Sequence, residues 1–285
     1  MPEFFRNFFR KEQSPTKIDE ETPKQPVLLE RTSLPERERR RSPFETAEEG
    51  ILESYEKKES RSLDGGTNKV VFVELKDDGS GVFKPKNGER EDRRLHIQAG
   101  TYFKRERAAY LVSQFLGFDL VPPTVIREID GEIGSMQQFI SDFKTGREVS
   151  PYKLVDDVLR KSFLKLWIFD YIIYNSDRNG GGFLVNDSGG EKMYAIDNAM
   201  SFCNDNPRPY EEFEEYWNLP IPPEVAEGIE KFLSWKEGRE ICEDLLRELL
   251  GPDEVEACMR RIEKVVRIIR KHGMIPRSSS WELTF

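Results

Sequence analysis

The spacing of apolar side chains changes near residue 63, and the part that follows predicts strands. Four short runs rich in apolar and β-branched residues are bounded by Gly, Asp and Pro, as strands usually are. Between the second and the third run, residues 106–116 carry apolar side chains at helical spacing and stop at Gly117, a residue typical of helix ends. The four runs are 69–76, 81–84, 121–129 and 134–140. This part therefore predicts two hairpins with one helix between them.

The rest of the chain has mainly helical patterns. A long apolar helix is expected over residues 152–174, and two short buried strands follow it at 182–185 and 194–196. A strand-rich part with one helix, followed by a helix-rich part, predicts an α+β fold with two lobes. The last three expected helices are 223–233, 235–250 and 252–271.

The N-terminal part has the composition of a disordered segment. Of the 52 residues in 11–62, 24 are charged and five are proline, so this stretch cannot bury enough apolar surface to offset the entropy of ordering. Before it, the four phenylalanines of the Phe4–Phe9 segment would share one face of a helix, which suits a partner's groove or a membrane surface. We therefore expect a disordered arm over residues 1–62, a strand-rich lobe over 63–142 and a helical lobe over 143–285.

Composition and charge exclude several functional classes. The formal net charge of −9 argues against a dedicated nucleic-acid binder, which usually carries a basic face. The three cysteines form no Cys-x-x-Cys pair and the two histidines stand alone, so neither a disulfide framework nor a zinc site is expected. No run reaches the roughly 18 apolar residues of a membrane helix, and the N-terminus lacks the apolar segment of a secretory signal. We therefore expect a soluble cytoplasmic protein.

The residues that could carry chemistry form an ordered series across both expected lobes. No Walker A motif and no Gly-x-Ser-x-Gly elbow occurs, which disfavours P-loop enzymes and hydrolase triads. A glycine turn can cover phosphates, a lysine held by a glutamate can neutralise them, and two aspartates can orient an acceptor hydroxyl and hold a metal ion. The residues in this order are Gly65, Gly66, Lys84, Glu106, Asp177 and Asp197. Their order therefore points to phosphoryl transfer from ATP with Mg²⁺.

The same part of the chain resembles the phosphatidylinositol 3-/4-kinase family, and most closely the type II phosphatidylinositol 4-kinases and their bacterial relatives. The resemblance covers about residues 63–250 and implies a protein-kinase-like fold, with a small strand-rich N-lobe and a mainly helical C-lobe. It also implies an ATP- and Mg²⁺-dependent kinase. The stretches that carry it are GVFKPKNGE (81–89), ERAAYLVSQFLGFDLVPPTV (106–125), GSMQQFISDFKTG (134–146), LWIFDYIIYNSDRNGGGFLV (166–185), YAIDNAMSFC (194–203) and YEEFEEYWNLP (210–220).

The resemblance assigns a role to each matching residue. It implies that Lys84 is the lysine that binds the ATP phosphates and that Glu106 is its partner. Asp177 would be the catalytic-loop aspartate, and Asp197 the aspartate that binds Mg²⁺. The hinge that hydrogen-bonds adenine would consist of Gln137, Gln138, Phe139 and Ile140.

Two departures from the family pattern concern the metal and the membrane. The family usually places a metal-binding asparagine five residues after the catalytic aspartate, and here that position is Gly182, which has no side-chain oxygen. Asn179, or Asn198 beside Asp197, is a candidate replacement. The alternative is a nucleotide-binding pseudokinase that acts as an interaction module. The cysteine-rich palmitoylation segment of eukaryotic type II enzymes is missing, so weak or no membrane association is expected. The acceptor is left open between a lipid hydroxyl and a protein hydroxyl.

Overall fold

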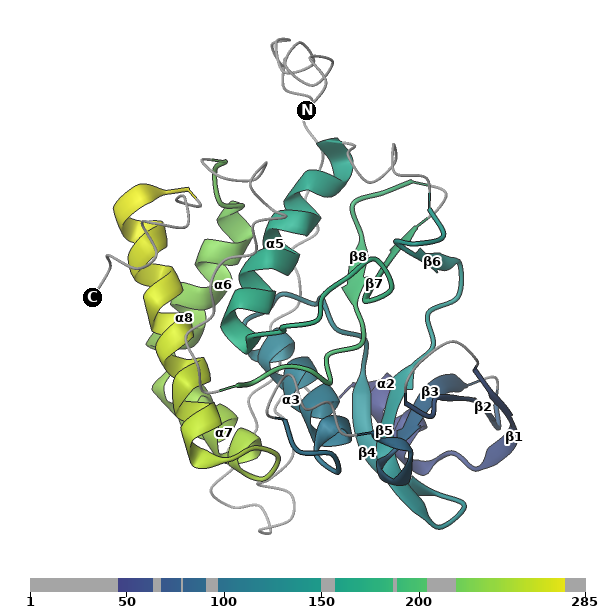
Figure 1. Cartoon of the computed structure of the whole chain (residues 1–285). Coiled ribbons are helices and arrows are strands. Elements are labelled where there is room, and N and C mark those ends of the chain that lie inside the picture. Colours follow the sequence, from purple (N-terminus) through teal and green to yellow (C-terminus); the bar gives the residue numbers. More distant parts are fainter. Residues whose placement is uncertain are drawn as a thin grey trace.

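The computed structural model describes residues 46–63, 68–77, 79–90, 97–149, 157–186, 189–203 and 219–274. The Phe4–Phe9 segment and the glycine pair Gly65 and Gly66 lie outside the described residues. Within the described part, a strand-rich lobe and a helical lobe lie side by side (Figure 1). The expected two-lobed α+β architecture is confirmed.

The N-lobe is built on a five-stranded antiparallel sheet with the strand order β1-β2-β3-β5-β4. One face of this sheet is apolar and packs against Leu52 of helix α2 (Ala47–Ser54). The strands are β1 (Lys57–Ser62), β2 (Val71–Leu75), β3 (Ser80–Pro85), β4 (Thr124–Ile129) and β5 (Glu132–Gln138). The side chains of the apolar face are Val73, Leu75, Phe83, Val125, Ile129 and Met136.

The opposite face of the sheet presents polar side chains toward the site. Because side chains alternate along a strand, Val82 and Lys84 lie on the face opposite to the buried Phe83. The register between β3 and β5 places Lys84 beside Ser135 and Val82 beside Gln137. The α2 core thus supports the sheet from behind while Lys84 faces away from it.

The expectation that the disordered arm extends to residue 62 is wrong, because residues 46–62 are ordered. They form α2, whose Thr46 and Glu49 make a reciprocal capping box, and the edge strand β1. Strand β1 has the sequence KKESRS, and its backbone pairs with β2 although nearly all of its side chains are exposed. Its order comes from backbone hydrogen bonds rather than from apolar burial, and a hydrophobicity pattern cannot reveal that. Gly65 and Gly66 therefore lie in the segment of the chain between β1 and β2, so a strand precedes them that the sequence did not predict.

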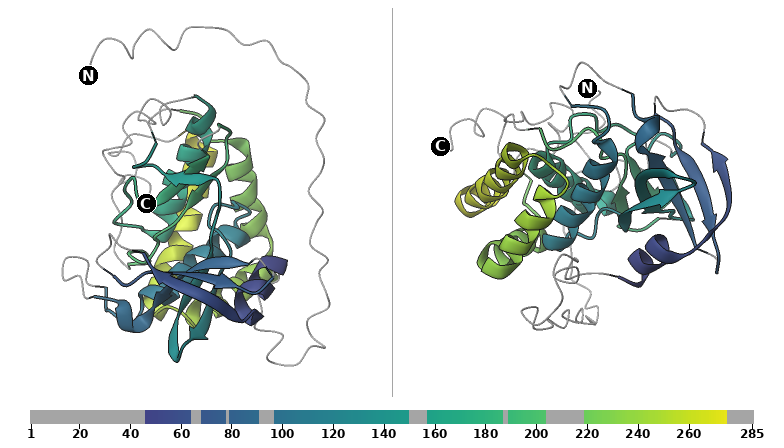
Figure 2. Two further views of the ribbon diagram at one scale, coloured as in Figure 1. Left: turned by 90° about the vertical axis from the view of Figure 1, so that its right-hand side faces the viewer. Right: turned by 90° about the horizontal axis from the view of Figure 1, so that it is seen from below.

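Helix α3 (Tyr102–Phe115) begins four residues before the expected start at Glu106 and belongs to the larger core of the C-lobe. Seen from below, it lies between the strands and the C-lobe helices (Figure 2, right). Its C-terminal end packs closely on α6, because a Cβ atom on Gly228 would lie 2.2 Å from the carbonyl oxygen of Leu116. The helix is thus fixed to the C-lobe, and this fixes the position of every side chain that it carries toward the sheet.

In its described residues, the C-lobe combines a small sheet with four helices. Its sheet has the antiparallel order β6-β7-β8, and of these strands only β6 was not expected. The sequence places a long apolar helix at the centre, and the structure shows α5 packed against α8 there. The elements are β6 (Phe143–Thr145), α5 (Asp157–Ile173), β7 (Phe183–Asn186), β8 (Met193–Ala195), α6 (Pro223–Ser234), α7 (Lys236–Arg247) and α8 (Pro252–His272).

Candidate active site

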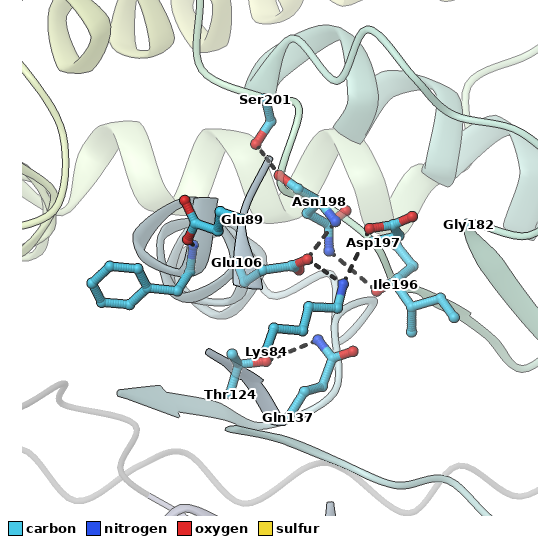
Figure 3. Close-up of polar contacts among 12 residues, drawn as sticks. Lys84, Glu89, Glu106, Thr124, Gln137, Gly182, Ile196, Asp197, Asn198 and Ser201 are labelled. Carbon is cyan, nitrogen blue, oxygen red and sulfur yellow. Dashed lines mark hydrogen bonds and ion pairs between the residues drawn. The ribbon is translucent and has the colours of Figure 1, made fainter. Parts of the chain in front are cut away.

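Three of the expected site residues meet between the lobes (Figure 3). Lys84 extends from β3, Glu106 from α3, and Asp197 from the loop after β8. The Nζ atom of Lys84 lies 2.5 Å from Oε1 of Glu106 and 3.1 Å from Oδ1 of Asp197. The fold therefore brings together a lysine and two carboxylates that are 22 and 113 residues from it in the sequence.

Glu106 also ties α3 to the loop that contains Asp197. Its side chain is buried, and its second oxygen, Oε2, accepts a hydrogen bond of 3.0 Å from the backbone N–H of Asn198. Asp197 itself adopts the left-handed backbone conformation with φ 57°. This turn exposes 60% of the Asp197 side chain, while Asn198 beside it is fully buried. The Asp197 carboxylate is therefore accessible to a ligand from the space between the lobes.

The electrostatics of the group keep Lys84 and Asp197 charged at neutral pH. Burial by itself would lower the pKa of Lys84, but the carboxylates of Asp197 and Glu106 outweigh burial and raise the pKa above its usual value. The positive charge of Lys84 lowers the pKa of Asp197, against a smaller opposing effect of burial. One lysine between two carboxylates leaves a net negative charge, which favours a cation beside the exposed oxygens of Asp197.

A cavity of about 90 Å³ adjoins this group, and its lining includes residues 68–70, which precede β2, and residues of the first turns of α3. The N-terminus of α3 borders this cavity and is held by Glu89. The carboxylate of Glu89 accepts hydrogen bonds from the backbone N–H groups of Tyr102, at 3.0 Å, and Phe103, at 2.8 Å. A carboxylate at this end satisfies helix donors that have no intrahelical partner. The lining consists of Asn68, Lys69, Val70, Lys84, Pro85, Glu89, Tyr102, Phe103, Glu106, Asp197 and Ala199.

The expected catalytic loop follows α5 directly. Asp177 is exposed, and its backbone N–H donates to the side chain of the buried Asn175 at 3.1 Å. The amide nitrogen of Asn179 donates to the carbonyl of Asp177 at 2.9 Å. These local bonds fix the turn that presents the Asp177 carboxylate to solvent. Its catalytic role stays a prediction.

The side-chain oxygen of Asn179, the candidate metal ligand, already accepts two hydrogen bonds from neighbouring residues. That oxygen accepts hydrogen bonds from the backbone N–H of Gly181, at 2.9 Å, and from Nη2 of Arg147, at 2.6 Å. Binding a cation would therefore require Asn179 to exchange the Arg147 guanidinium for the metal. The metal-binding role of Asn179 stays a prediction.

Two arginines explain the three consecutive glycines of this loop. A Cβ atom on Gly180 or Gly181 would lie 3.1–3.2 Å from side-chain atoms of Arg147, which covers this part of the loop. A Cβ atom on Gly182 would lie 2.9 Å from Nη1 of Arg178. The absence of side chains at these positions therefore allows both guanidinium groups to contact the loop.

Arg178 is the centre of a buried polar network. Its guanidinium binds both carboxylate oxygens of Asp170 in α5, at 2.8 Å each, and the exposed fractions of the two side chains are 2% and 0%. It also donates to the carbonyl oxygens of Gly182 and Ile196 and to Oδ1 of Asn198. Burial raises the pKa of Asp170, and the charge of Arg178 partly offsets this effect. A charge inside the apolar run 163–174 was the signal for a buried partner.

The expected hinge lies at the end of β5 and beyond it. The backbone N–H groups of Gln138 and Phe139 donate to the carbonyl oxygens of Pro123, at 2.8 Å, and Ser80, at 3.1 Å, so these two donors are committed within the sheet. The side-chain amide of Gln137 donates to Oγ1 of Thr124 at 2.9 Å (Figure 3). Adenine binding by this segment stays a prediction, which now concerns its carbonyl groups and Ile140.

Two features of the described residues limit the kind of site. They contain no group of three or more His, Cys, Asp or Glu side chains arranged to hold a metal ion by themselves. Mg²⁺ usually binds through one or two carboxylates together with substrate phosphates, so an exposed Asp197 fits a cation that arrives with a nucleotide. No helix in the described ranges is long and apolar enough to cross a membrane.

Similarity to known proteins agrees with this architecture. No family model matches the chain. The chain is 30% identical over 156 residues to protein Rv2133c of Mycobacterium tuberculosis (strain ATCC 25618 / H37Rv), which covers 44% of this chain and 55% of that protein. The chain thus spans about half the length of this curated relative. The more specific resemblance to inositol-lipid kinases finds no support among these relatives.

Solved structures of similar shape include two of the Golgi casein kinase. One has a TM-score of 0.53 at 17% identity and covers 81% of this chain and 76% of that chain. The other, with Mn/ADP bound, has a TM-score of 0.51 at 17% identity and covers 77% of this chain and 74% of that chain. At this identity the likeness concerns the fold alone. The chain has a two-lobed kinase-like fold, with a strand-rich N-lobe and a helical C-lobe.

Proposed function

We propose that this protein is an ATP- and Mg²⁺-dependent kinase that transfers the γ-phosphate of ATP to a hydroxyl group. The observation that carries the proposal is the contact of Lys84 with both Glu106 and Asp197 beside the cavity. A lysine on a strand that is held by a helix glutamate, next to an exposed aspartate, matches the positions that ATP phosphates and their metal require. The Mn/ADP bound to a Golgi casein kinase of similar fold supports nucleotide and metal use.

Each residue has a defined task in this proposal. Lys84 binds phosphate oxygens of ATP, and Glu106 holds the lysine in place. Asp197 holds the Mg²⁺ ion, which would neutralise charge on the phosphates when bound. Asp177 accepts a hydrogen bond from the acceptor hydroxyl and orients it toward the γ-phosphate. Its exposed position at the loop turn leaves room for an acceptor.

The acceptor is a lipid or protein hydroxyl. The sequence resemblance favours an inositol lipid, and the name of the Golgi casein kinase refers to a protein as acceptor of that enzyme. Both acceptors present an alcohol hydroxyl, so the chemistry assigned to Asp177 is the same.

A nucleotide-binding pseudokinase is the second candidate, and Gly182 is the observation that favours it. This position lacks the side-chain oxygen that usually binds a second metal ion, and the buried Arg178 occupies the adjacent space. Such a protein would bind ATP through Lys84 and would not transfer phosphate.

The two candidates are separated by measuring binding and turnover on the same samples. At an ATP concentration of about 100 Kd, binding adds about 2.7 kcal/mol to the free energy of unfolding, which thermal unfolding detects. We expect Lys84→Ala to lose this Mg²⁺-dependent stabilisation and the control Lys76→Ala, at an exposed lysine of the same lobe, to keep it. Asp177→Ala should bind ATP normally and release no ADP, while the control Asp244→Ala, at an exposed aspartate on α7, should release ADP as the wild type does.

The outcomes are distinct. A wild type that is stabilised by ATP but never releases ADP is a pseudokinase. A wild type that ATP does not stabilise, or a Lys84→Ala variant that ATP stabilises equally, contradicts both candidates.

A further inference from the structure

A continuous chain of polar contacts runs from the N-lobe sheet to the centre of the C-lobe. Lys84 contacts Glu106, and Glu106 accepts a hydrogen bond from the backbone of Asn198. The side chain of Asn198 accepts from Arg178 at 2.6 Å, and Arg178 forms its bidentate pair with Asp170. Five residues from β3, α3, the loop after β8, the catalytic loop and α5 are thus connected.

We infer that Arg178, held by Asp170, is the positioning residue that sets the geometry of the metal-binding aspartate Asp197. This inference rests on the proposed kinase function. Arg178 touches neither nucleotide nor acceptor in this role, and it acts through its contacts with the two residues that flank Asp197.

The guanidinium group of Arg178 contacts both neighbours of Asp197 in the sequence. Arg178 donates to the carbonyl oxygen of Ile196, the residue before Asp197, and to the side chain of Asn198, the residue after it. Asp197 between these two anchors has φ 57°, a conformation that costs free energy for a residue other than glycine and persists only when its surroundings enforce it. The two anchors, together with the bond from Asn198 to Glu106, are the surroundings that enforce it.

The same group also connects the two loops of the active site. Arg178 directly follows Asp177 in the sequence, and its Nη1 atom donates to the carbonyl oxygens of both Gly182 and Ile196. The position of Asp177 relative to Asp197 therefore depends on one rigid planar group. Lysine cannot replace this pattern, because an ammonium lacks the fixed fork of donors that arginine presents.

Asp170 supplies the negative charge that stabilises the buried guanidinium group of Arg178. An arginine side chain that is 2% exposed requires a counter-charge, since an unpaired buried charge is strongly destabilising. The bidentate geometry with Asp170 also fixes the plane of the guanidinium, so that its remaining donors point at Gly182, Ile196 and Asn198. The charge that interrupts the apolar α5 helix thus has a consequence at the active site.

The test compares metal binding and turnover in Arg178→Lys, Asp170→Asn and Asn198→Ala with the wild type. Binding of Mn²⁺·ATP is followed by the electron paramagnetic resonance of Mn²⁺, and turnover by ADP release with Mg²⁺. Residues that orient a metal ligand typically contribute about 10- to 100-fold to metal affinity or activity. We therefore expect Arg178→Lys to weaken Mn²⁺ binding in the presence of ATP by about 10-fold or more, and to lower kcat more than it raises the KM for ATP.

Arg261→Lys is the matched control. Arg261 is another buried arginine of the C-lobe, and it donates to the backbone carbonyl oxygens of Ile172 and Cys203. We expect this variant to lower the melting temperature while kcat per folded molecule and Mn²⁺ affinity stay at wild-type values. Asn198→Ala leaves the pair of Arg178 with Asp170 intact, so it provides a folded variant in which only one anchor is lost.

The outcomes distinguish this inference from the proposed function. Wild-type Mn²⁺ affinity in both Arg178→Lys and Asn198→Ala would overturn the positioning role, whatever the turnover. A wild type that binds Mn²⁺·ATP without turnover would refute the kinase function, while a weaker Mn²⁺ affinity in the variants would still support the positioning of Asp197. A wild type that does not bind Mn²⁺·ATP overturns both.

Discussion

Gly182→Ala is expected to destabilise the protein although its backbone needs no special conformation. Gly182 is absent from the positions of the described chain that have positive φ, so alanine meets no backbone strain there. Its added Cβ atom would lie 2.9 Å from Nη1 of Arg178, 3.3 Å from the carbonyl oxygen of Asn179 and 3.4 Å from Cδ of Arg178. An exposed arginine would move aside, but Asp170 holds this one with two hydrogen bonds of 2.8 Å. The clash must therefore displace the loop or break the buried pair.

The magnitude follows from the cost of overpacking. Inserting a methyl group into a closely packed interior typically costs about 1–3 kcal/mol. For a chain of this size, each kcal/mol shifts the melting temperature by about 2–4 °C, so we expect Gly182→Ala to melt about 2–12 °C below the wild type. Gly182→Asn, which returns the usual metal-binding amide, should be at least as unstable and should not raise ATP turnover.

Gly50→Ala is the matched control, because it introduces the same atom where there is space. Gly50 lies within α2, and no atom lies within 4 Å of the Cβ atom that alanine would add. Replacing glycine in a helix by alanine stabilises by about 0.5–1 kcal/mol. Differential scanning calorimetry should therefore show shifts of opposite sign for the two variants. A Gly182→Ala protein that melts at or above the wild-type temperature would refute the packing argument for this loop.

Two further predictions concern α2 and pH. Glu49 of α2 is 1% exposed and pairs with Arg107, so Glu49→Ala should lower the free energy of unfolding by about 3 kcal/mol in a urea titration; the exposed Glu48→Ala should change it by no more than about 0.5 kcal/mol, and equal effects would contradict the docking of α2. The pKa of Lys84 is raised in the folded state, so its stabilising charge is fully present below about pH 10.4 and is lost only as the pH rises through the higher folded-state pKa. The pKa of Asp197 is lowered in the folded state, so its contribution to stability is present above about pH 3.9 and is lost as the pH falls through the lower folded-state pKa. Stabilisation by ATP with Mg²⁺ should therefore be constant between about pH 7 and pH 9, and a transition inside this range would show that another group controls binding.

Periodicity was sufficient for most of the fold because most elements bury one apolar face. The hairpin of β2 and β3, helix α5 and the three C-terminal helices all lie within a few residues of the ranges that the pattern predicts. Helix α3 was placed correctly in order and begins at Tyr102, ahead of its expected start, because its first turn is held by Glu89 from outside the helix. A cap from a distant residue leaves no local signal in the sequence.

The elements that the pattern missed are ordered by contacts other than apolar burial. Strand β1 has no apolar residue and depends on backbone pairing with β2. Helix α2 has only eight residues, and one of its two buried side chains is the charged Glu49, whose partners Arg107 and Tyr110 lie 58 and 61 residues away. High charge predicted disorder for both elements, although in α2 the charge is paired and buried.

The candidate site shows the same division. The order of Lys84, Glu106 and Asp197 along the chain predicted a common site, and the structure brings the three side chains together. Each lies in or just after an element that the pattern locates. The contacts of Arg178 depend on how α5, the catalytic loop and the loop after β8 pack in three dimensions. Only the structure could show that Gly182 borders a buried guanidinium, which gives this glycine a packing role as well as a missing oxygen.

The central claim is that this site transfers the γ-phosphate of ATP, and ³¹P NMR of Mg²⁺·ATP incubated with the full chain tests it most directly. The wild type should deplete the γ-phosphate resonance and produce ADP together with a phosphorylated acceptor or free phosphate. Asp177→Ala should leave the ATP spectrum unchanged over the same time while still binding the nucleotide. Equal depletion by the wild type and by Asp177→Ala, or no depletion by either when both bind Mg²⁺·ATP, would contradict the account.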